Sequence, residues 1–191
     1  MKKSLGAQTL LYPTPVLIVG SYDADGRANV MNAAWGGVAC SKPPCISVSL
    51  RSATASHANI MRRRAFTVSL PSEQYVEHAD FVGIVSGRDV DKFAVTGLTA
   101  VRSELVDAPY VGEFPIVLEC TVVAVHELGL HTQFIGQVED VKADDSVLLD
   151  NGSVDVDALK PILYAMPGSY RAVGRYLGKA FSVGTSFRDK G

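Results

Sequence analysis

The stretch NVMNAAWGGV, residues 29–38, decides how this sequence folds. It contains two asparagines, the only tryptophan of the chain and a run of alanine and glycine, where barrel strands usually carry bulky β-branched side chains. Side chains this small leave space beside the backbone, so that a flat ligand can approach the N–H and C=O groups. The competing interpretation is a bulged strand whose small residues provide packing space for Trp35.

The segments on either side of this stretch have the pattern of strands. PVLIVGSYD (15–23) leads into a turn, and we expect RANVMNAAWGGVAC (27–40) to return as its hairpin partner. Four further strands are expected, the last two antiparallel to each other, at CISVSLR (45–51), AFTVSL (65–70), IVLECTVVAVHEL (116–128) and HTQFIGQVEDVKA (131–143). Hairpins interrupted by short helices predict a mainly β protein with a closed or nearly closed antiparallel barrel.

The composition is that of an ordinary globular protein, with 191 residues, 47% of them hydrophobic, and a formal net charge of -2. We expect a single domain over residues 1–191. So small a charge creates no field that would attract nucleic acid or anionic lipid, and no apolar run is long enough to span a bilayer. The N-terminal apolar run is broken by prolines and lacks a cleavage site, so we expect a cytoplasmic protein without a signal peptide.

The cysteines and histidines point away from a metal site. The three cysteines are an odd number without a C-x-x-C pair, which favours two or three buried thiols in a reducing compartment over a disulfide framework or a zinc site. His126 and His131 are five residues apart and would point to opposite faces of one strand, so we expect no bound metal. The basic cluster at residues 62–64 is expected to be the solvated end of a helix.

Polar side chains are concentrated where the strand at 45–51 passes into the next helix. Within a few positions the chain offers an arginine, three hydroxyl side chains and a histidine, namely Arg51, Ser52, Thr54, Ser56 and His57. The N-terminus of a helix has unpaired N–H groups and a positive dipole end, which together suit a phosphate. A simple N-cap needs only one hydroxyl, so this density favours an anion site.

An anion site beside a strand with small side chains predicts a phosphorylated planar cofactor. We favour FMN over pyridoxal phosphate, because no lysine in this region is placed to form a Schiff base. Neither G-x-G-x-x-G nor a Walker A sequence occurs, so a Rossmann or P-loop nucleotide site is not expected. No side chain is required as a catalytic nucleophile, because the chemistry would occur at the flavin.

Several fragments together resemble the flavin reductase-like, FMN-binding split-barrel family, and within it the flavoredoxin branch. The fragments follow the family's order along nearly the whole chain: NVMNAAW, CISVSLR with SATASHANI, FTVSLP, HADFVGIVSGRDVDKF with GLT, DVDALKPILY and YRAVGRYLG. This resemblance implies a six-stranded Greek-key split β-barrel that is homodimeric and binds FMN non-covalently near the subunit interface.

The resemblance also implies which residues hold the flavin. The isoalloxazine would be lined by Asn29, Val30, Met31, Asn32, Ala33 and Ala34. The ring edge and the ribityl phosphate would be held by Ser49, Leu50, Arg51, Ser56 and His57. Lys92 would lie close to flavin N1 and O2, although from the sequence alone it also reads as a surface lysine paired with Asp89 or Asp91. Tyr170 and Tyr176 belong to a tail that would close over the site.

The expected function is therefore that of an FMN-binding redox protein that transfers electrons or hydride. The electron donor is either NAD(P)H or a partner redox protein, and the sequence leaves both open. The alternative from a different class is a non-catalytic split-barrel module that binds flavin or haem, with His57, His126 or His131 as a haem ligand.

Overall fold

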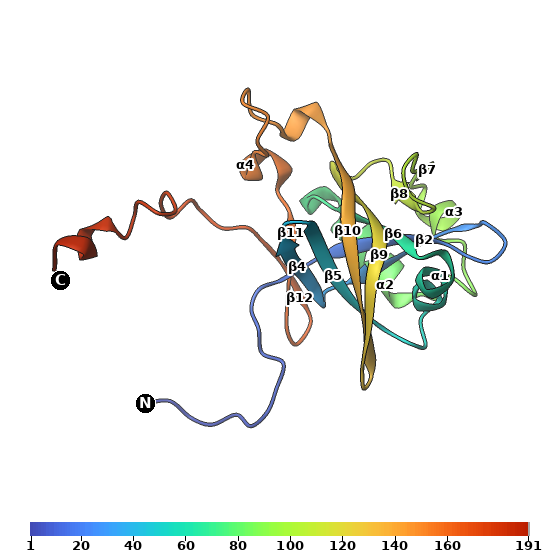
Figure 1. Cartoon of the computed structure of the whole chain (residues 1–191), viewed down its shortest axis with the longest axis horizontal. Coiled ribbons are helices and arrows are strands. Elements are labelled where there is room, and N and C mark those ends of the chain that lie inside the picture. Colours follow the sequence, from blue (N-terminus) through green and yellow to red (C-terminus); the bar gives the residue numbers. More distant parts are fainter. Residues whose placement is uncertain (191) are drawn as a thin grey trace.

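A seven-stranded antiparallel sheet forms the body of the protein, with the strand order β3-β2-β6-β9-β10-β5-β4. The structure is a computed structural model that describes residues 1–190. The strands of this sheet are β2 (Leu17–Tyr22), β3 (Ala28–Ala33), β4 (Gly36–Ser41), β5 (Pro44–Arg51), β6 (Ala65–Leu70), β9 (Ile116–Leu128) and β10 (His131–Ala143). Figure 1 shows β9 and β10 as the long central hairpin, in agreement with the predicted antiparallel pair.

The connection between β3 and β4 forces this sheet to close. The two strands lie at opposite edges, yet only Ala34 and Trp35 join them. In a flat sheet the edges of seven strands would be about 29 Å apart, whereas the chain from Ala33 to Gly36 spans at most about 11 Å. The sheet therefore curls into a barrel, and the Ser49 N–H donates to the Trp35 carbonyl at 2.7 Å where the edges meet.

The predicted mainly β split barrel is confirmed, with one correction to its strands. Residues 27–40 were expected to form one hairpin partner of β2, but of these residues only those of β3 pair with β2. After Trp35 the chain crosses to β5, and Gly36 lies opposite Val48. The main sheet consequently has seven strands instead of the six that the family resemblance implied.

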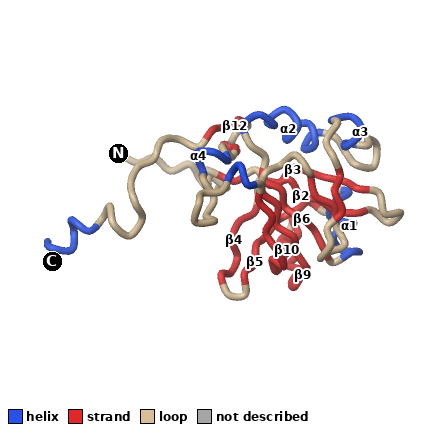
Figure 2. The backbone as a smooth tube through the Cα atoms, turned by 90° about the horizontal axis from the view of Figure 1, so that it is seen from above, coloured by secondary structure: helices blue, strands red, loops and turns tan. Residues whose placement is uncertain are grey.

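Helices cover the barrel at two places. They are α1 (Ala55–Arg63), α2 (Val76–Ile84), α3 (Lys92–Thr96) and α4 (Val156–Leu159), with 3-10 turns at η1 (Glu73–Tyr75), η2 (Asp145–Val147) and η3 (Thr185–Lys190). Helix α1 packs against β2, β3, β5 and β6 and buries Ile60 in the barrel core beside Phe66 and Phe134. Figure 2 shows α2 and α3 on the same side of the sheet, where Val82 and Phe93 pack in a second cluster with Val30.

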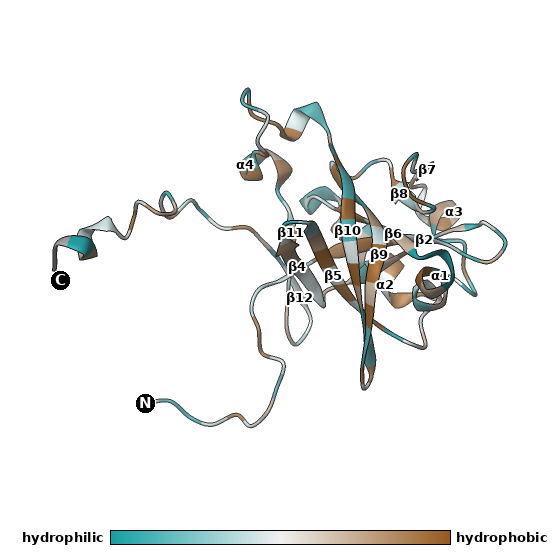
Figure 3. Cartoon of the chain, in the orientation of Figure 1, coloured by the Kyte–Doolittle hydropathy of each residue, from teal (hydrophilic) through white to brown (hydrophobic). Residues whose placement is uncertain are grey.

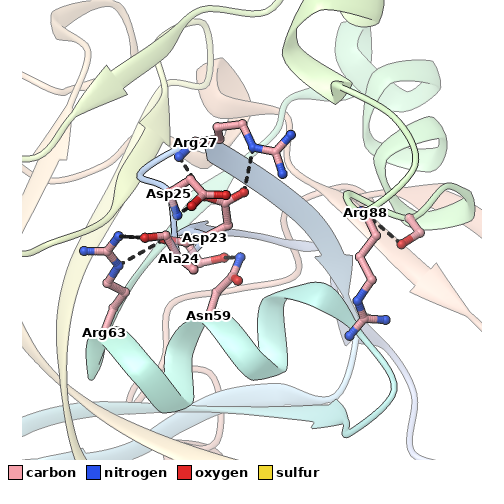
Figure 4. Close-up of polar contacts among 9 residues, drawn as sticks. Asp23, Ala24, Asp25, Arg27, Asn59, Arg63 and Arg88 are labelled. Carbon is pink, nitrogen blue, oxygen red and sulfur yellow. Dashed lines mark hydrogen bonds and ion pairs between the residues drawn. The ribbon is translucent and has the colours of Figure 1, made fainter.

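At the basic end of α1, Arg62 and Arg64 are exposed as the sequence interpretation expected, but Arg63 is not simply solvated. Arg63 Nη2 donates to the Asp23 carbonyl at 2.6 Å and to the Ala24 carbonyl at 3.3 Å, and Nη1 forms an ion pair with Asp107 at 3.0 Å. Figure 4 shows Arg63 reaching the β2–β3 turn from α1. The arginine therefore holds that turn against the helix, since hydrogen bonds from a charged donor are shorter and stronger than neutral ones.

Two small sheets and two extended tails complete the chain. Strands β1 (Thr14–Pro15), β11 (Ile162–Ala165) and β12 (Ser169–Ala172) form one sheet, and β7 (Ala100–Arg102) pairs with β8 (Pro109–Val111) in another. The N-terminal segment and the segment after β12 extend away from the barrel (Figure 1). Figure 3 shows apolar stretches within the C-terminal tail. This tail extends away from the barrel and does not pack on it.

The tight crossing at the β3–β4 connection predicts unequal effects of two adjacent substitutions. A Cβ at Gly36 would lie 2.5 Å from the Ser47 carbonyl oxygen and 2.7 Å from Leu17 Cδ1, whereas a Cβ at Gly37 would meet nothing within 4 Å. Gly36→Ala should therefore lower the free energy of unfolding by about 1–3 kcal/mol. Gly37→Ala is the matched control and should change it little. Urea unfolding of both variants measures this, and equal effects would contradict the close approach.

Candidate functional site

Two adjoining clefts lie beside the β3–β4 connection. The larger, which we call the barrel-edge cleft, has a volume of about 410 Å³. The smaller, the helix-end cleft, has a volume of about 240 Å³ and lies at the N-terminus of α1. Both clefts are lined by Met31, Thr54, Gly83 and Ile84, so they form one continuous depression. Such a shape can receive an elongated ligand that is flat at one end and polar at the other.

Most of the residues predicted from the sequence line these clefts. The barrel-edge cleft is lined by Met31, Asn32, Ala33, Ala34, Ser49, Leu50, Arg51 and Tyr170. The helix-end cleft is lined by Asn29, Met31, Ser56 and Lys92. Strand β3 supplies residues to both clefts because the barrel edge at which it ends adjoins the start of α1.

Four of the predicted residues are absent from both linings: Val30 and His57, Ser52 of the expected anion site, and Tyr176 of the tail, which is 76% exposed. The side chain of Val30 is buried in the cluster beneath α2. His57 Nε2 lies 2.9 Å from Thr132 Oγ1, and its ring meets the edge of Phe134, so its side chain is directed toward β10. Burial lowers the pKa of His57, which keeps the imidazole neutral near pH 7. Its backbone N–H serves the α1 cap by donating to Thr54 Oγ1 at 3.2 Å.

A chain of hydrogen bonds crosses one wall of the barrel-edge cleft. Asn32 Nδ2 donates to the Ala79 carbonyl at 2.9 Å and to the Tyr170 hydroxyl oxygen at 3.2 Å. The Tyr170 hydroxyl in turn donates to Asp80 Oδ1 at 2.8 Å. Burial and the Asp80 carboxylate raise the pKa of Tyr170, which keeps this donor protonated. Strand β3, helix α2 and strand β12 are thus connected around the cleft.

Polar groups that keep unused hydrogen-bonding capacity line the helix-end cleft. Asn29 Nδ2 donates to Ser56 Oγ at 2.8 Å, which leaves the Ser56 hydroxyl hydrogen available to a ligand. Asn29 Oδ1 is buried and has no hydrogen-bond partner. Buried polar atoms are nearly always paired, so this oxygen marks a position that suits a hydroxyl or N–H donor. Residues 53–56, at the start of α1, line the same cleft, and a helix N-terminus favours an anion.

Lys92 is buried rather than on the surface. Its Nζ donates to the Val30 carbonyl at 2.8 Å and to the Val82 carbonyl at 2.7 Å, so it links β3 to α2. The interpretation as a surface lysine paired with Asp89 or Asp91 is therefore wrong. Burial lowers the pKa of Lys92 to about 8. The amino group remains largely protonated at neutral pH and adds positive charge to the wall of the helix-end cleft.

Sequence reasoning missed the contribution of the segment 79–88. Gly83 and Gly87 line the clefts, and a Cβ at either position would press against Asn32 or Asn29. Arg88 Nη1 donates to the Ala53 carbonyl at 2.7 Å and so holds the loop before α1; Figure 4 shows its side chain reaching past β3 toward that loop. The glycines read as an ordinary helix end in the sequence, because their partners come from a strand fifty residues earlier.

Among residues 1–190 there is no cluster of three or more His, Cys, Asp or Glu side chains that could hold a metal ion. His126 and His131 lie on β9 and β10, where they pair with Gln133 and Leu128, respectively, and not with each other. No helix in the described part of the chain is long and apolar enough to cross a membrane.

Residues 9–174 match the family model described as "Flavin reductase like domain", and the chain belongs to this family. The solved structure of flavoredoxin from Desulfovibrio vulgaris (Miyazaki F) is 55% identical to it, with 96% of this chain and 100% of that chain covered and a TM-score of 0.92. Flavoredoxin from Methanosarcina acetivorans is 30% identical, with coverages of 98% and 99% and a TM-score of 0.92. A curated relative from Aeropyrum pernix is 29% identical over 82% of this chain, which spans 59% of that relative's length.

Burial of Lys92 predicts a pH-dependent contribution to stability. Its pKa is about 8 in the folded chain and 10.5 for the free side chain, so the unfolded chain binds more protons between these values. Raising the pH from 8 to 10.5 should therefore stabilise the wild-type chain relative to Lys92→Met, by at most about 1.4 kcal/mol per pH unit. Urea unfolding across this range measures the difference. Lys42→Met, at an exposed lysine, is the control. If the difference in unfolding free energy between the wild-type chain and Lys92→Met did not change with pH, the burial of Lys92 would be contradicted.

Proposed function

We propose that this protein binds FMN non-covalently along the two clefts and acts as a flavin-dependent oxidoreductase or electron carrier. The observation that carries the proposal is that the two clefts are continuous. The barrel-edge cleft is lined by small and aromatic residues, and the helix-end cleft contains a buried unpaired oxygen and the N-terminus of α1. Membership of the flavin reductase-like family and the 55% identity to a flavoredoxin support the same assignment.

The residues present fit each part of FMN. Ala33 and Ala34 allow a flat ring system to approach the backbone of the barrel edge, and Asn32 and Tyr170 present polar atoms at its rim. The unpaired Asn29 Oδ1 suits a ribityl hydroxyl, because a hydroxyl can donate to it. The Ser56 hydroxyl and the α1 N–H groups suit a phosphate. A cleft of about 240 Å³ matches a single ribityl phosphate better than a dinucleotide, which favours FMN over FAD.

Bound FMN would supply the redox chemistry by accepting and releasing hydride or electrons. The role of the chain is then to bind, orient and charge-balance the cofactor. Lys92 places a cation beside the helix-end cleft. The Val30 and Val82 carbonyls fix the position of its amino group. Arg51 and His131 line the barrel-edge cleft, and Arg51 is exposed, so a nicotinamide donor or a partner redox protein would approach beside it.

Absorption spectroscopy of the purified protein tests the cofactor and the donor together. Incubation with FMN should give oxidised-flavin bands that stay with the protein through gel filtration. Bleaching of these bands by NADH or NADPH would indicate a flavin reductase, and bleaching by dithionite alone would indicate a carrier fed by a protein partner. Absence of flavin bands, or the spectrum of bound haem instead, would refute the proposal.

The phosphate position is tested by comparing FMN with riboflavin. Ser56→Ala should weaken FMN binding by about 1.5–3 kcal/mol, the usual loss for a hydrogen bond to a charged group, and riboflavin binding much less. Ser69→Ala is the matched control, because Ser69 is equally buried but accepts a hydrogen bond from the Val111 N–H outside the clefts. Equal losses for FMN and riboflavin would place the phosphate elsewhere.

We propose that the C-terminal tail binds a second copy of the chain. Tyr176 is 76% exposed, Leu177 82% and Phe181 101%, so this segment buries none of its large apolar side chains on its own barrel. Apolar side chains so exposed favour burial against a partner. A homodimer covers them in both copies at once through the same surface.

Light scattering during gel filtration should therefore report a dimer for the wild-type chain. The double variant Leu177→Asp with Phe181→Asp should dissociate to a monomer at concentrations where the wild-type chain remains dimeric, because each charge would have to be buried. Ser182→Asp adds a charge to the same tail without removing an apolar group and should remain a dimer. A monomeric wild-type chain would refute the proposed partner.

A further inference from the structure

The β4–β5 hairpin brings two cysteines opposite each other. The strand register pairs Cys40 with Cys45 across the two-residue turn Lys42–Pro43, at the end of the hairpin that projects from the barrel (Figure 2). Residues directly opposite in an antiparallel ladder have Cα atoms about 4.5–5.5 Å apart. A disulfide requires a Cα separation of about 4.4–6.8 Å, so the backbone already has the spacing of a bridged pair.

The two thiols differ in accessibility. Cys40 is exposed, and its Sγ lies 3.4 Å from the Lys42 carbonyl oxygen, a weak contact that rotation about χ1 would break. Cys45 is only 6% exposed. A soluble disulfide can therefore reach Cys40 first, and Cys45 is reached most readily by the sulfur of Cys40.

The third thiol cannot take part. Cys120 lies on β9, which is separated from β5 by β10, so its Cα is roughly 9–10 Å from that of Cys45. Bridging fails beyond about 7 Å. Burial also raises the pKa of the Cys120 thiol to about 12, which suppresses the reactive thiolate. The pairing is consequently restricted to Cys40 and Cys45.

We propose that Cys40 and Cys45 form a reversible thiol–disulfide couple that closes by exchange with a low-molecular-weight disulfide such as oxidised glutathione. The Cys40 thiolate attacks one sulfur, releases one glutathione as thiol and forms a mixed disulfide. The Cys45 thiolate then attacks the Cys40 sulfur and releases the second glutathione. Two protein thiols are oxidised, one glutathione disulfide is reduced to two thiols, and the two protons pass to the released thiols.

Closure of this bridge acts on the register of the hairpin. A register shift lies between Val38 and Cys40, where one extra residue of β4 bulges out of the ladder. A covalent link immediately after the bulge prevents β4 from slipping along β5. Because β5 continues to Ser49 and Arg51, the oxidised form fixes the strand that lines the barrel-edge cleft.

Mass spectrometry of the full-length protein tests the couple. The reduced chain is incubated with oxidised glutathione, quenched in acid, alkylated and digested. The expected result is a peptide that has lost two hydrogens through a Cys40–Cys45 bridge, with two glutathione thiols released per chain. A stable glutathione adduct on Cys40 in the wild-type chain, or a bridge between two chains, would overturn the proposal.

Three variants assign each step. In Cys45→Ser the reaction should stop at a Cys40–glutathione adduct with one thiol released. In Cys40→Ser no glutathione should be taken up, because Cys45 is buried. The control Cys120→Ala should behave as the wild-type chain, since Cys120 lies outside bridging distance. Equal glutathione uptake by Cys40→Ser and Cys45→Ser would contradict the proposed order of attack.

Discussion

The two-residue connection between β3 and β4 is the constraint on which the rest of the structure depends. It requires opposite edges of a seven-stranded sheet to meet, and Gly36 can make the crossing only because it has no side chain. The same crossing leaves Ala33 and Ala34 at the end of β3, where the barrel edge is open. Closure of the barrel and formation of the cleft are therefore consequences of one short segment.

The elements around the clefts are placed by polar contacts to that segment. Asn32 connects β3 to α2 and to the C-terminal hairpin, and Asn29 connects β3 to the first turn of α1. Helix α1 begins where β5 ends, so the strand that meets β3 at the barrel edge also delivers the helix N-terminus. The cleft proposed to receive a flat, phosphorylated ligand is thus shaped by the topology of the barrel.

Local patterns predicted much of the fold but not the partners of each strand. Long β runs identified the hairpin at 116–143, and hydroxyl residues followed by an apolar pair and arginines identified the helix after Arg51, because these signals depend on neighbouring residues alone. The break after Ala34 was missed, since nothing in residues 27–40 shows that its second half pairs with β5. The burial of Lys92 was missed for the same reason: one of its acceptors, Val30, is sixty-two residues away in the sequence. The direction of the His57 side chain likewise depends on Thr132 of a distant strand.

The buried amino group of Lys92 has a consequence for how a ligand is received. It joins a strand and a helix through two short bonds to backbone carbonyls, and such charge-assisted bonds in a low-dielectric environment are costly to break. The relative position of β3 and α2 is consequently set before any ligand arrives. These two elements therefore have little conformational entropy left to lose when a ligand associates beside them.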